Sequence, residues 1–299
     1  MSGGVDSAVT AALAARRNDA SGITLKLYDG NQDLLIKKFA QESGDAAEVC
    51  RKLGINHTVL DLKEDFYKLV IKYFIDEYIA GNTPNPCIQC NINIKFGAML
   101  DYAQKNGFDK IATGHYARIE KCGDKFLLKK ALDGTKDQSY VLYGLTQEQL
   151  SHTEFPLGCY TKAQAREIAE ELELCFARKS DSQDICFVPN GDYASFIENE
   201  IGKSFKSGDY VDIDGNLLGS HKGVIHYTVG QRKGLGISLG KHAFVLDKDA
   251  KTNKITLGDE QYLFYKTVEV KDVNIISEKS LDGVKCEAKL RYRHNQQPC

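Results

Sequence analysis

The first third of the chain alternates short apolar runs with amphipathic segments. The runs at 22–28 ("GITLKLY") and 57–62 ("HTVLDL") predict buried strands. The segments at 44–55 and 63–81 repeat apolar residues at helical spacing, and each contains a glycine at or next to its end. Strands separated by helices predict βαβ crossovers and a parallel sheet, whose ligands collect at the carboxyl ends of its strands.

Two further elements continue this pattern, a helix over 93–107 and a strand over 109–119 that ends in a turn. The sequences "NPCIQC" and "TGHYA" then fall at loop or strand-end positions. From about residue 195 the chain becomes rich in Gly and Asp with short alternating runs, which favours small barrel-like β modules. We expect a hairpin over 241–259 and strands over 265–276 and 284–293.

Composition narrows the class of protein. Hydrophobic residues make up 42% and charged residues 27% of the 299 residues, which is typical of a globular protein with two or three domains. No apolar run reaches the length of a membrane-spanning helix, and the first residues do not resemble a secretory signal. The net charge of −2 excludes a uniformly basic RNA-binding surface but allows a local one. Nine scattered cysteines favour a reducing, cytoplasmic location.

The opening loop "SGGVDS" precedes an alanine-rich helix. Glycines at a helix N-terminus leave backbone amides accessible, and phosphate is the usual ligand of such amides. A flexible loop capped by Ser7 is the alternative. The loop also resembles the S-G-G-x-D-S signature of ATP pyrophosphatases (PP-loop enzymes), which implies cleavage of ATP between the α and β phosphates with Mg²⁺ bound. The nucleotide-binding positions implied by this resemblance are Met1, Ser2, Gly3, Gly4, Val5, Asp6 and Ser7.

Three of the cysteines have distinctive surroundings: Cys87 and Cys90 in "NPCIQC", and Cys186 in "SQDICF". A structural zinc site would need a second closely spaced Cys or His pair, and none occurs. A thioredoxin-like redox motif does not fit beside a nucleotide loop. We interpret the remaining cysteines as having no chemical role: Cys50 and Cys175 as core residues, and Cys122, Cys159, Cys286 and Cys299 as isolated thiols.

Taken together, "SGGVDS", "NPCIQCNINIKF", "ATGHYAR", "KDQSY", "SQDICF", "TVGQRKGLGI" and "RYRHNQQPC" resemble the bacterial-type tRNA-specific 2-thiouridylases, in order along nearly the whole chain. The resemblance implies a Rossmann-like α/β PP-loop catalytic domain over 1–198, a small β-rich domain over 199–263 and the start of a C-terminal β-barrel over 264–299. It also implies a strand before Met1 and further barrel strands beyond Cys299.

The implied reaction is ATP-dependent 2-thiolation of the wobble uridine of tRNA. The C2 oxygen is adenylated and then replaced by sulfur from a cysteine persulfide. The resemblance implies that Cys186 bears the persulfide and that Cys90 resolves it, with a transient disulfide between them. One well-known form of the family has an aspartate at the position of Cys87, so the acid/base role stays open here. A [4Fe–4S] cluster on Cys87, Cys90 and Cys186 is an alternative.

The resemblance also implies binding positions. Leu25 and Gly114 correspond to adenosine contacts, although Leu25 could equally be a core residue. The positions expected to contact tRNA are Asn85, Pro86, Cys87, His115, Lys136, Asp137, Gln138, Arg291 and Tyr292. His115 could instead be a strand-end histidine bonded to backbone, and 136–138 a solvated turn. Arg291, Tyr292 and Arg293 alternate charge with an aromatic ring, which suits RNA, and Arg232 with Lys233 offers a second phosphate-binding patch.

Two other functions remain open from the sequence. One is a different PP-loop enzyme, such as an argininosuccinate- or GMP-synthetase-like amidating enzyme, which would need no paired reactive cysteines. The other is a non-catalytic tRNA-binding protein, which would not need an intact nucleotide loop. The thiolation reaction would require tRNA and a sulfur-donor protein, such as a cysteine desulfurase or a sulfur-relay protein, as partners.

Overall fold

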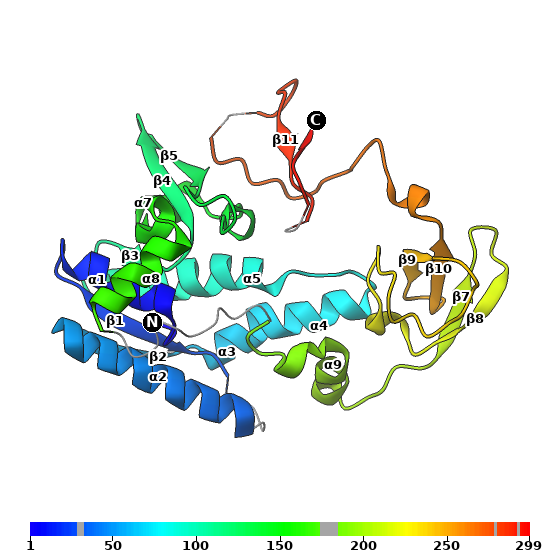
Figure 1. Cartoon of the computed structure of the whole chain (residues 1–299), viewed down its shortest axis with the longest axis horizontal. Coiled ribbons are helices and arrows are strands. Elements are labelled where there is room, and N and C mark those ends of the chain that lie inside the picture. Colours follow the sequence, from blue (N-terminus) through cyan, green and yellow to red (C-terminus); the bar gives the residue numbers. More distant parts are fainter. Residues whose placement is uncertain (29–32, 174–184, 278–279, 292–293) are drawn as a thin grey trace. The chain divides into compact units, whose positions relative to one another are not determined.

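The computed structural model of the chain describes residues 1–28, 33–173, 185–277, 280–291 and 294–299. The chain divides into two compact units (Figure 1). Unit 1 comprises 1–69, 87–183 and 273–299, and unit 2 comprises 70–86 and 184–272. The division therefore does not follow the chain in one cut. The domain boundaries expected after residues 198 and 263 stay predictions.

Unit 1 contains two parallel strand pairs, so the predicted parallel pairing is confirmed. In the first pair Ile23 lies opposite Thr58, and in the second Ile111 lies opposite Thr153. The strands are β1 (Ser21–Lys26) with β2 (Asn56–Asp61), and β3 (Ile111–Ala112) with β6 (Thr153–Glu154). The long helix α2 (Asp33–Leu53) contacts both strands of the first pair.

A proline marks the start of one helix in the first half of the chain. α5 starts at Pro86, a residue suited to the first turn of a helix because its missing N–H has no partner there. The helix expected over 93–107 therefore begins earlier, and its first part is a π-helix. The helices of unit 1, together with α5, which begins at the border with unit 2, are α1 (Val5–Ala15), α2, α3 (Lys63–Phe66), α5 (Pro86–Gln89), the π-helix η2 (Cys90–Ala98), α6 (Met99–Lys105), α7 (Gln147–Ser151) and α8 (Lys162–Glu171).

The strand expected over 109–119 is two strands in different sheets. β3 ends at Ala112, and its ladder closes with the N–H of Thr113 donating to the Glu154 carbonyl at 3.2 Å. The chain then turns through Gly114, and β4 (Ala117–Cys122) pairs antiparallel with β5 (Lys125–Lys130). Apolar alternation could not reveal this break, because it is made by the turn and not by a change of pattern.

Unit 2 is built on a four-stranded sheet in the order β8-β7-β10-β9. The predicted hairpin over 241–259 is confirmed as the antiparallel pair β9–β10, and β10 also pairs in parallel with β7. The side chains of Tyr210, Val245 and Ile255 are fully buried in its core. The elements of this unit are α4 (Lys72–Ile79), α9 (Tyr193–Ile201), β7 (Gly208–Val211), β8 (Leu217–His221), β9 (Phe244–Asp249) and β10 (Lys254–Gly258). A π-helix, η1 (Tyr67–Ile71), joins α3 to α4, so the helix predicted over 63–81 consists of three successive pieces.

Beyond residue 263 the strand predictions are largely wrong. The described residues of 264–299 contain only the two-residue antiparallel strands β11 (Glu287–Ala288) and β12 (Gln297–Pro298). Residues 265–276 alternate as a strand would, yet no strand within the described part of the chain pairs with them, and Tyr265 and Val270 remain 70% and 67% exposed. The expected start of a C-terminal barrel is not confirmed and stays a prediction.

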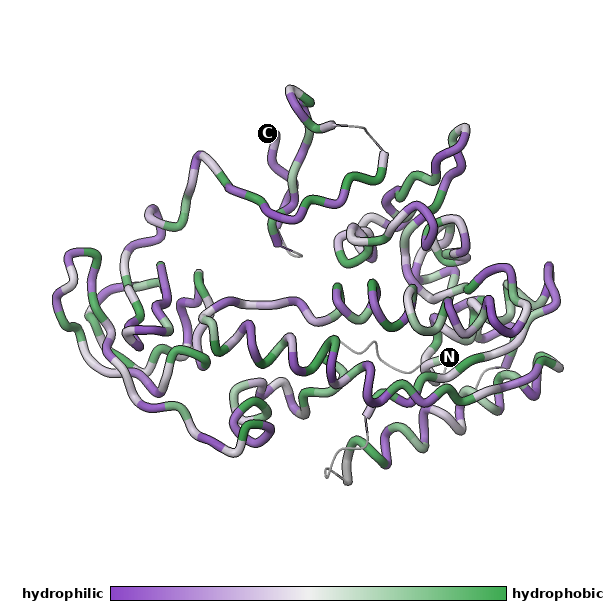
Figure 2. Tube along the Cα trace, turned by 180° about the vertical axis from the view of Figure 1, so that it is seen from behind, coloured by the Kyte–Doolittle hydropathy of each residue, from purple (hydrophilic) through white to green (hydrophobic). Residues whose placement is uncertain are grey.

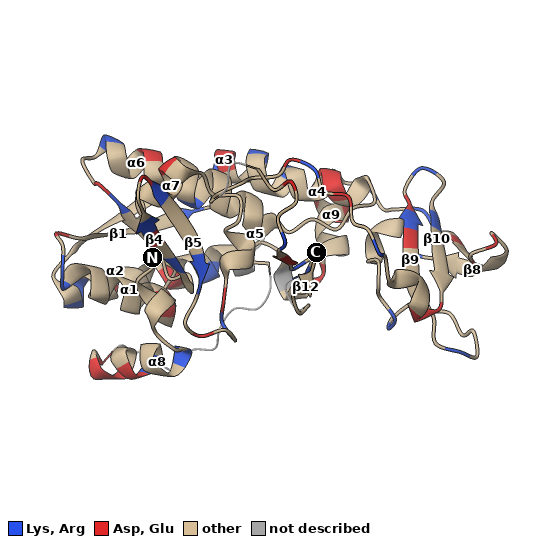
Figure 3. Cartoon of the chain, turned by 90° about the horizontal axis from the view of Figure 1, so that it is seen from above, with Lys and Arg blue, Asp and Glu red and all other residues tan. Residues whose placement is uncertain are grey.

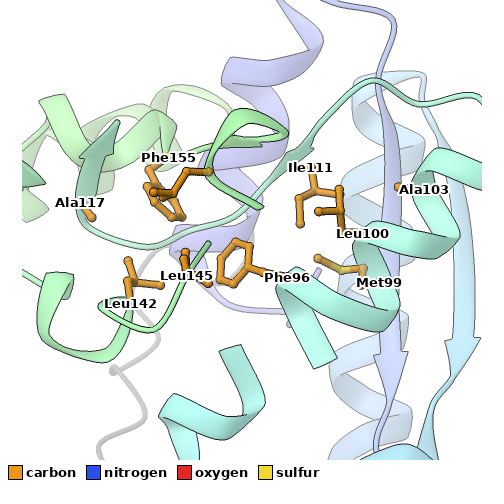
Figure 4. Packing of buried hydrophobic residues seen from close by; sticks show 10 residues of the cluster. Phe96, Met99, Leu100, Ala103, Ile111, Ala117, Leu142, Leu145 and Phe155 are labelled. Carbon is orange, nitrogen blue, oxygen red and sulfur yellow. The ribbon is translucent and has the colours of Figure 1, made fainter. Parts of the chain in front are cut away.

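The core that supports η2 and α6 is a cluster of apolar side chains (Figure 4). The ring of Phe96 meets that of Phe155 edge-on, with 5.8 Å between the ring centres, and Leu142 and Leu145 are fully buried beside them.

Hydrophobic positions are interrupted by hydrophilic ones along the helices (Figure 2). Among the described residues, no helix is both long and apolar enough to cross a membrane.

Replacing Leu145 with Ala should lower the free energy of unfolding by about 2–5 kcal/mol, because the buried side chain leaves a cavity. Urea denaturation followed by circular dichroism measures the change. Leu132→Ala is the matched control, since Leu132 is 62% exposed and should change stability by no more than about 0.5 kcal/mol. Equal effects of the two substitutions would contradict this assignment of the core.

Candidate active site

The nucleotide loop is held closely against α2. Gly3 has φ +62°, and a Cβ there would lie 2.6 Å from the Glu42 carbonyl oxygen, so only glycine fits. The Ser7 hydroxyl donates to the Gly4 carbonyl at 2.9 Å and accepts from the Ser2 amide at 3.2 Å. α1 begins at Val5. The loop therefore presents backbone amides at a helix start without obstruction by side chains, as an anion site requires.

The carboxylate of Asp6 joins three segments of unit 1. Lys162 Nζ lies 2.8 Å from both carboxylate oxygens, and the Tyr116 hydroxyl donates to Oδ1 at 2.9 Å. Lys162 is only 7% exposed and is the first residue of α8, whose start is fixed by a capping box between Thr161 and Gln164. Lys162 was not predicted as a site residue. The only local signal in the sequence is the capping box formed by Thr161 and Gln164, which indicates that Lys162 begins a helix but not that it binds Asp6.

Gly114 lies against the same loop. A Cβ on Gly114 would be 3.0 Å from the backbone carbon of Asp6, so the expected adenosine contact and the nucleotide loop meet. Leu25, on β1, is half-buried and packs against the core cluster of Phe96 and Leu145. Met1 packs against a second core cluster that includes Val5 and Val9. The structure thus brings the expected nucleotide residues Gly114 and 1–7 together, whereas the core reading of Leu25 has direct support.

Cys87 and Cys90 lie on α5 and at the start of η2. Cys87 is exposed, whereas Cys90 is 8% exposed. Burial raises the pKa of the Cys90 thiol, and the positive charge of Lys95 partly opposes this shift. The protein around Cys87 raises the pKa of that thiol too, although the residue keeps an exposed surface, and Lys95 again opposes the shift. One cation therefore acts on both thiols.

The π-helical geometry of η2 brings Lys95 close to Cys90. A π-helix bonds residue i to residue i+5, so Lys95 lies one turn beyond Cys90. The side-chain amide of Gln149 donates to the carbonyls of Ile92 and Phe96 at 3.0 and 2.9 Å, which stabilises this unusual turn. π-turns occur often at functional sites.

His115 is buried between the rings of Phe96 and Phe155, each with its centre 5.8 Å away. Its Nδ1 is 2.8 Å from the Thr113 hydroxyl and its Nε2 is 3.5 Å from Lys95 Nζ. Burial, and then the charge of Lys95, holds the pKa of His115 well below its ordinary value. The imidazole is therefore neutral at pH 7. Because lysine can only donate, Nε2 accepts, and Nδ1 carries the proton toward Thr113.

The loop at 136–138 has a structural function in addition to any contact with RNA. Asp137 accepts from the Ala131 amide at 2.9 Å, and Gln138 accepts from the Tyr116 amide at 2.9 Å. Lys136 is half-buried, and Arg291 is exposed. Several Lys and Arg residues lie along β4 and β5 (Figure 3), and no prediction from the sequence covered them. Tyr292 and Arg293 lie outside the described residues.

Cys186 belongs to unit 2, and it is exposed. The next residue, Phe187, is 2% exposed and packs edge-on against Phe74 with 5.4 Å between ring centres. It also contacts Phe196 at the same centre-to-centre distance. An anchored aromatic ring thus fixes the chain beside an accessible thiol. The proximity of Cys186 to Cys90 stays a prediction.

The remaining expected positions lie in unit 2. Asn85 and Pro86 precede the border between the units, which falls before Cys87. Arg232 and Lys233 are exposed, and Arg232 lines a hollow of about 460 Å³ with Lys241 and His242.

Two of the remaining cysteines are not isolated, contrary to the prediction from the sequence. The sulfur atoms of Cys286 and Cys299 are 3.3 Å apart. Cys50 is buried, as expected, and Cys175 lies outside the described residues. No disulfide joins any of the described cysteines, and in the same residues no group of three or more His, Cys, Asp or Glu could hold a metal ion.

Comparison with known proteins identifies the family. The fold and the loop define a class of protein in which a nucleotide-binding α/β domain is joined to a small β-rich domain. Residues 1–190 match the family model described as "tRNA methyl transferase HUP domain", and 194–259 match "tRNA methyl transferase PRC-barrel domain". The chain belongs to the family of tRNA-specific 2-thiouridylases, to whose members it is similar over almost its whole length.

Three such relatives bear the name "tRNA-specific 2-thiouridylase MnmA". The protein of Treponema denticola is 49% identical over 99% of this chain and 82% of its own length. The protein of Clostridioides difficile is 47% identical over 100% and 84%, and that of Acetivibrio thermocellus 48% over 98% and 84%. Among solved structures, NMN synthetase from Francisella tularensis matches with a TM-score of 0.37 and 19% identity, covering 69% of this chain and 76% of that one.

Replacing Lys162 with Met should lower the free energy of unfolding by about 1–3 kcal/mol, because the Asp6 carboxylate loses its charged partner. Urea denaturation measures it. Adding Asp6→Asn should cost less than the sum of the two single effects, since the side chains are coupled. Lys129→Met, which removes only an exposed pair with Glu120, is the control. Strict additivity of the Asp6 and Lys162 substitutions would contradict the coupling.

Replacing Lys95 with Met should raise the pKa of the Cys90 thiol further, since a nearby cation favours the thiolate. In a Cys87→Ser background, iodoacetamide should alkylate Cys90 more slowly at every pH below that pKa, and the rates should converge at high pH. Mass spectrometry of the Cys90 peptide follows the reaction. Lys95→Arg should retain the original profile, and so should Lys110→Met, which alters an exposed pair with Glu154. An unshifted profile in Lys95→Met would exclude the electrostatic role.

Proposed function

We propose that this protein catalyses the ATP-dependent 2-thiolation of the wobble uridine of tRNA, as a tRNA-uridine 2-sulfurtransferase. The observation that carries the proposal is the identity of 44–49% to enzymes named tRNA-specific 2-thiouridylase, over 98–100% of the chain. A different PP-loop amidating enzyme or a non-catalytic tRNA-binding protein would not account for similarity of this extent. No structural observation favours either alternative.

In the first step the C2 carbonyl oxygen of the uridine attacks the α-phosphate of ATP, and pyrophosphate leaves. The amides at the start of α1 are suited to hold the leaving pyrophosphate. Because Gly114 has no side chain, its backbone lies against that of Asp6, which puts the position expected to contact adenosine beside the loop. His115 adds no charge beside the base, because its imidazole is neutral and its two nitrogens already face the Thr113 hydroxyl and Lys95 Nζ.

The loop also fits a magnesium ion. Mg²⁺ in nucleotide sites is held by one or two carboxylates together with substrate phosphates. Asp6 is the carboxylate of the loop, and its side chain keeps 32% of its surface exposed beside Lys162 and Tyr116. Bound there, Mg²⁺ would offset the charge that develops on the pyrophosphate. Asp6 is the residue of this chain that would hold it.

In the second step sulfur replaces the adenylated oxygen. The terminal sulfur of a persulfide on Cys186 attacks C2, and AMP leaves with the oxygen. The Cys90 thiolate then attacks the Cys186 sulfur, which leaves 2-thiouridine on the tRNA and a Cys90–Cys186 disulfide. The exposure of Cys186 suits loading by a sulfur-donor protein, and the charge of Lys95 favours the Cys90 thiolate. Cys87 is the exposed thiol beside Cys90, and its acid/base role stays open.

The binding of tRNA would use Asn85, Pro86 and Cys87 at the target base, together with Lys136 and Arg291 on the RNA backbone. Substrate tRNA and a cysteine desulfurase or sulfur-relay protein are the partners that this reaction requires, and the cytoplasm is where we expect them to meet. A [4Fe–4S] version of the reaction, with the cluster on Cys87, Cys90 and Cys186, is the alternative. Iron and sulfide analysis after anaerobic purification distinguishes it.

The experiment is to incubate the protein with tRNA, ATP, Mg²⁺ and a persulfide donor, and to analyse nucleosides for 2-thiouridine. Cys186→Ser and Cys90→Ser should abolish the product, whereas tRNA-dependent release of pyrophosphate should continue in Cys186→Ser, because adenylation precedes sulfur transfer. Cys159→Ser, at an exposed cysteine outside the proposed site, is the control. Undiminished thiolation by Cys186→Ser would refute the assignment of the persulfide.

A further inference from the structure

Cys286 and Cys299 form a cross-strand pair at the ends of β11 and β12. Their sulfur atoms are 3.3 Å apart. The Cys286 amide donates to the Cys299 carbonyl at 3.0 Å, and the Cys299 amide donates to the Cys286 carbonyl at 2.8 Å. The two residues therefore exchange both backbone hydrogen bonds, which continues the register in which Glu287 lies opposite Pro298.

Contacts with the rest of unit 1 hold each arm of this pair. On the first arm, the Leu290 carbonyl accepts from the Tyr140 hydroxyl at 3.2 Å, and Lys289 Nζ lies 6.0 Å from the centre of the Tyr140 ring. On the second arm, Gln296 accepts from Lys130, which is on β5. The alignment of the two thiols thus depends on more than two short strands.

The geometry suits a covalent bond between the sulfurs. Directly opposed residues that exchange both backbone hydrogen bonds have Cα atoms about 5.5 Å apart, within the range that disulfides span. Both cysteines are exposed, so a small oxidant can reach them. The hydrogen bond between the two thiols raises the pKa of Cys299, so reaction through its thiolate should accelerate as the pH rises.

We propose that Cys286 and Cys299 form an oxidisable dithiol site that reacts with low-molecular-weight disulfides such as oxidised glutathione. One cysteine thiolate attacks the glutathione disulfide, forms a mixed disulfide and expels one glutathione thiolate. The second cysteine thiolate then attacks the protein sulfur of that mixed disulfide, which forms the Cys286–Cys299 bond and expels the second glutathione thiolate. Two electrons pass from the cysteine pair to glutathione.

The site lies outside the proposed thiolation chemistry and does not depend on it. Its closure would join residues 286 and 299 into a covalent ring that contains Arg291, one of the residues expected to face tRNA. The bond would remove the freedom of the two arms to separate from each other.

The test equilibrates the native protein in glutathione buffers of increasing oxidised fraction, followed by acid quenching, alkylation and tryptic digestion. Trypsin releases 286–289 ("CEAK") separately from the peptide that begins at His294 and contains Cys299, and the disulfide would link the two peptides. We expect the linked peptide to predominate in buffers where Cys122 and Cys159, also exposed, carry glutathione in no more than about a tenth of molecules.

Two comparisons make the result decisive. In concentrated urea the linked fraction in the same buffer should fall, by roughly tenfold relative to free glutathionylation, because the arms no longer hold the thiols together. In Cys286→Ser, Cys299 should carry only glutathione, at a level similar to Cys122. Separate glutathione adducts on Cys286 and Cys299 in the native protein, or a linked fraction no greater in native protein than in urea, would overturn the proposal.

Discussion

The ion pair between Asp6 and Lys162 is the contact on which the arrangement of unit 1 depends. Its two residues are 156 positions apart, and the Tyr116 hydroxyl completes the set. One carboxylate thereby fixes the first turn of α1, the start of α8 and the segment that carries Gly114 and His115. Because Lys162 is buried, water competes little for its charge, so the contact specifies one arrangement more strongly than an exposed pair could.

Around the paired cysteines, two opposing effects set the chemistry. Burial disfavours the Cys90 thiolate, and the charge of Lys95 favours it, so the thiol stays protonated at rest yet remains close to a group that stabilises its ionised form. The same cation faces a neutral His115 between two phenylalanine rings. The two phenylalanine rings and the charge of Lys95 suit an electron-rich base and an anionic sulfur better than a fully solvated surface would.

The sequence predicted those elements whose structure depends mainly on residues close together in the chain. The strands β1 and β2 and the helical stretches within 44–55, 63–81 and 93–107 followed from periodicity, whereas α7, α8 and α9 were not predicted. The nucleotide loop and NPCIQC followed from motif resemblance. Features set by distant partners were missed or wrong: Lys162, whose partner lies far along the chain, the break of 109–119 at Gly114, and the contact of Cys286 with Cys299. Residues 265–276 show the converse case, since a strand-like pattern forms no strand without a neighbour to pair with.

The π-helix at Cys90–Ala98 makes chain length, and not only residue type, a constraint on the thiol site. An α-helix advances about 100° per residue. If this stretch were wound as an ordinary α-helix with every residue kept, five residues would span about 500°, so Lys95 would lie about 140° around the axis from Cys90 and its cation would turn away from the sulfur. Removing one residue between them would restore the alignment in an α-helix, because residues four apart lie on the same face.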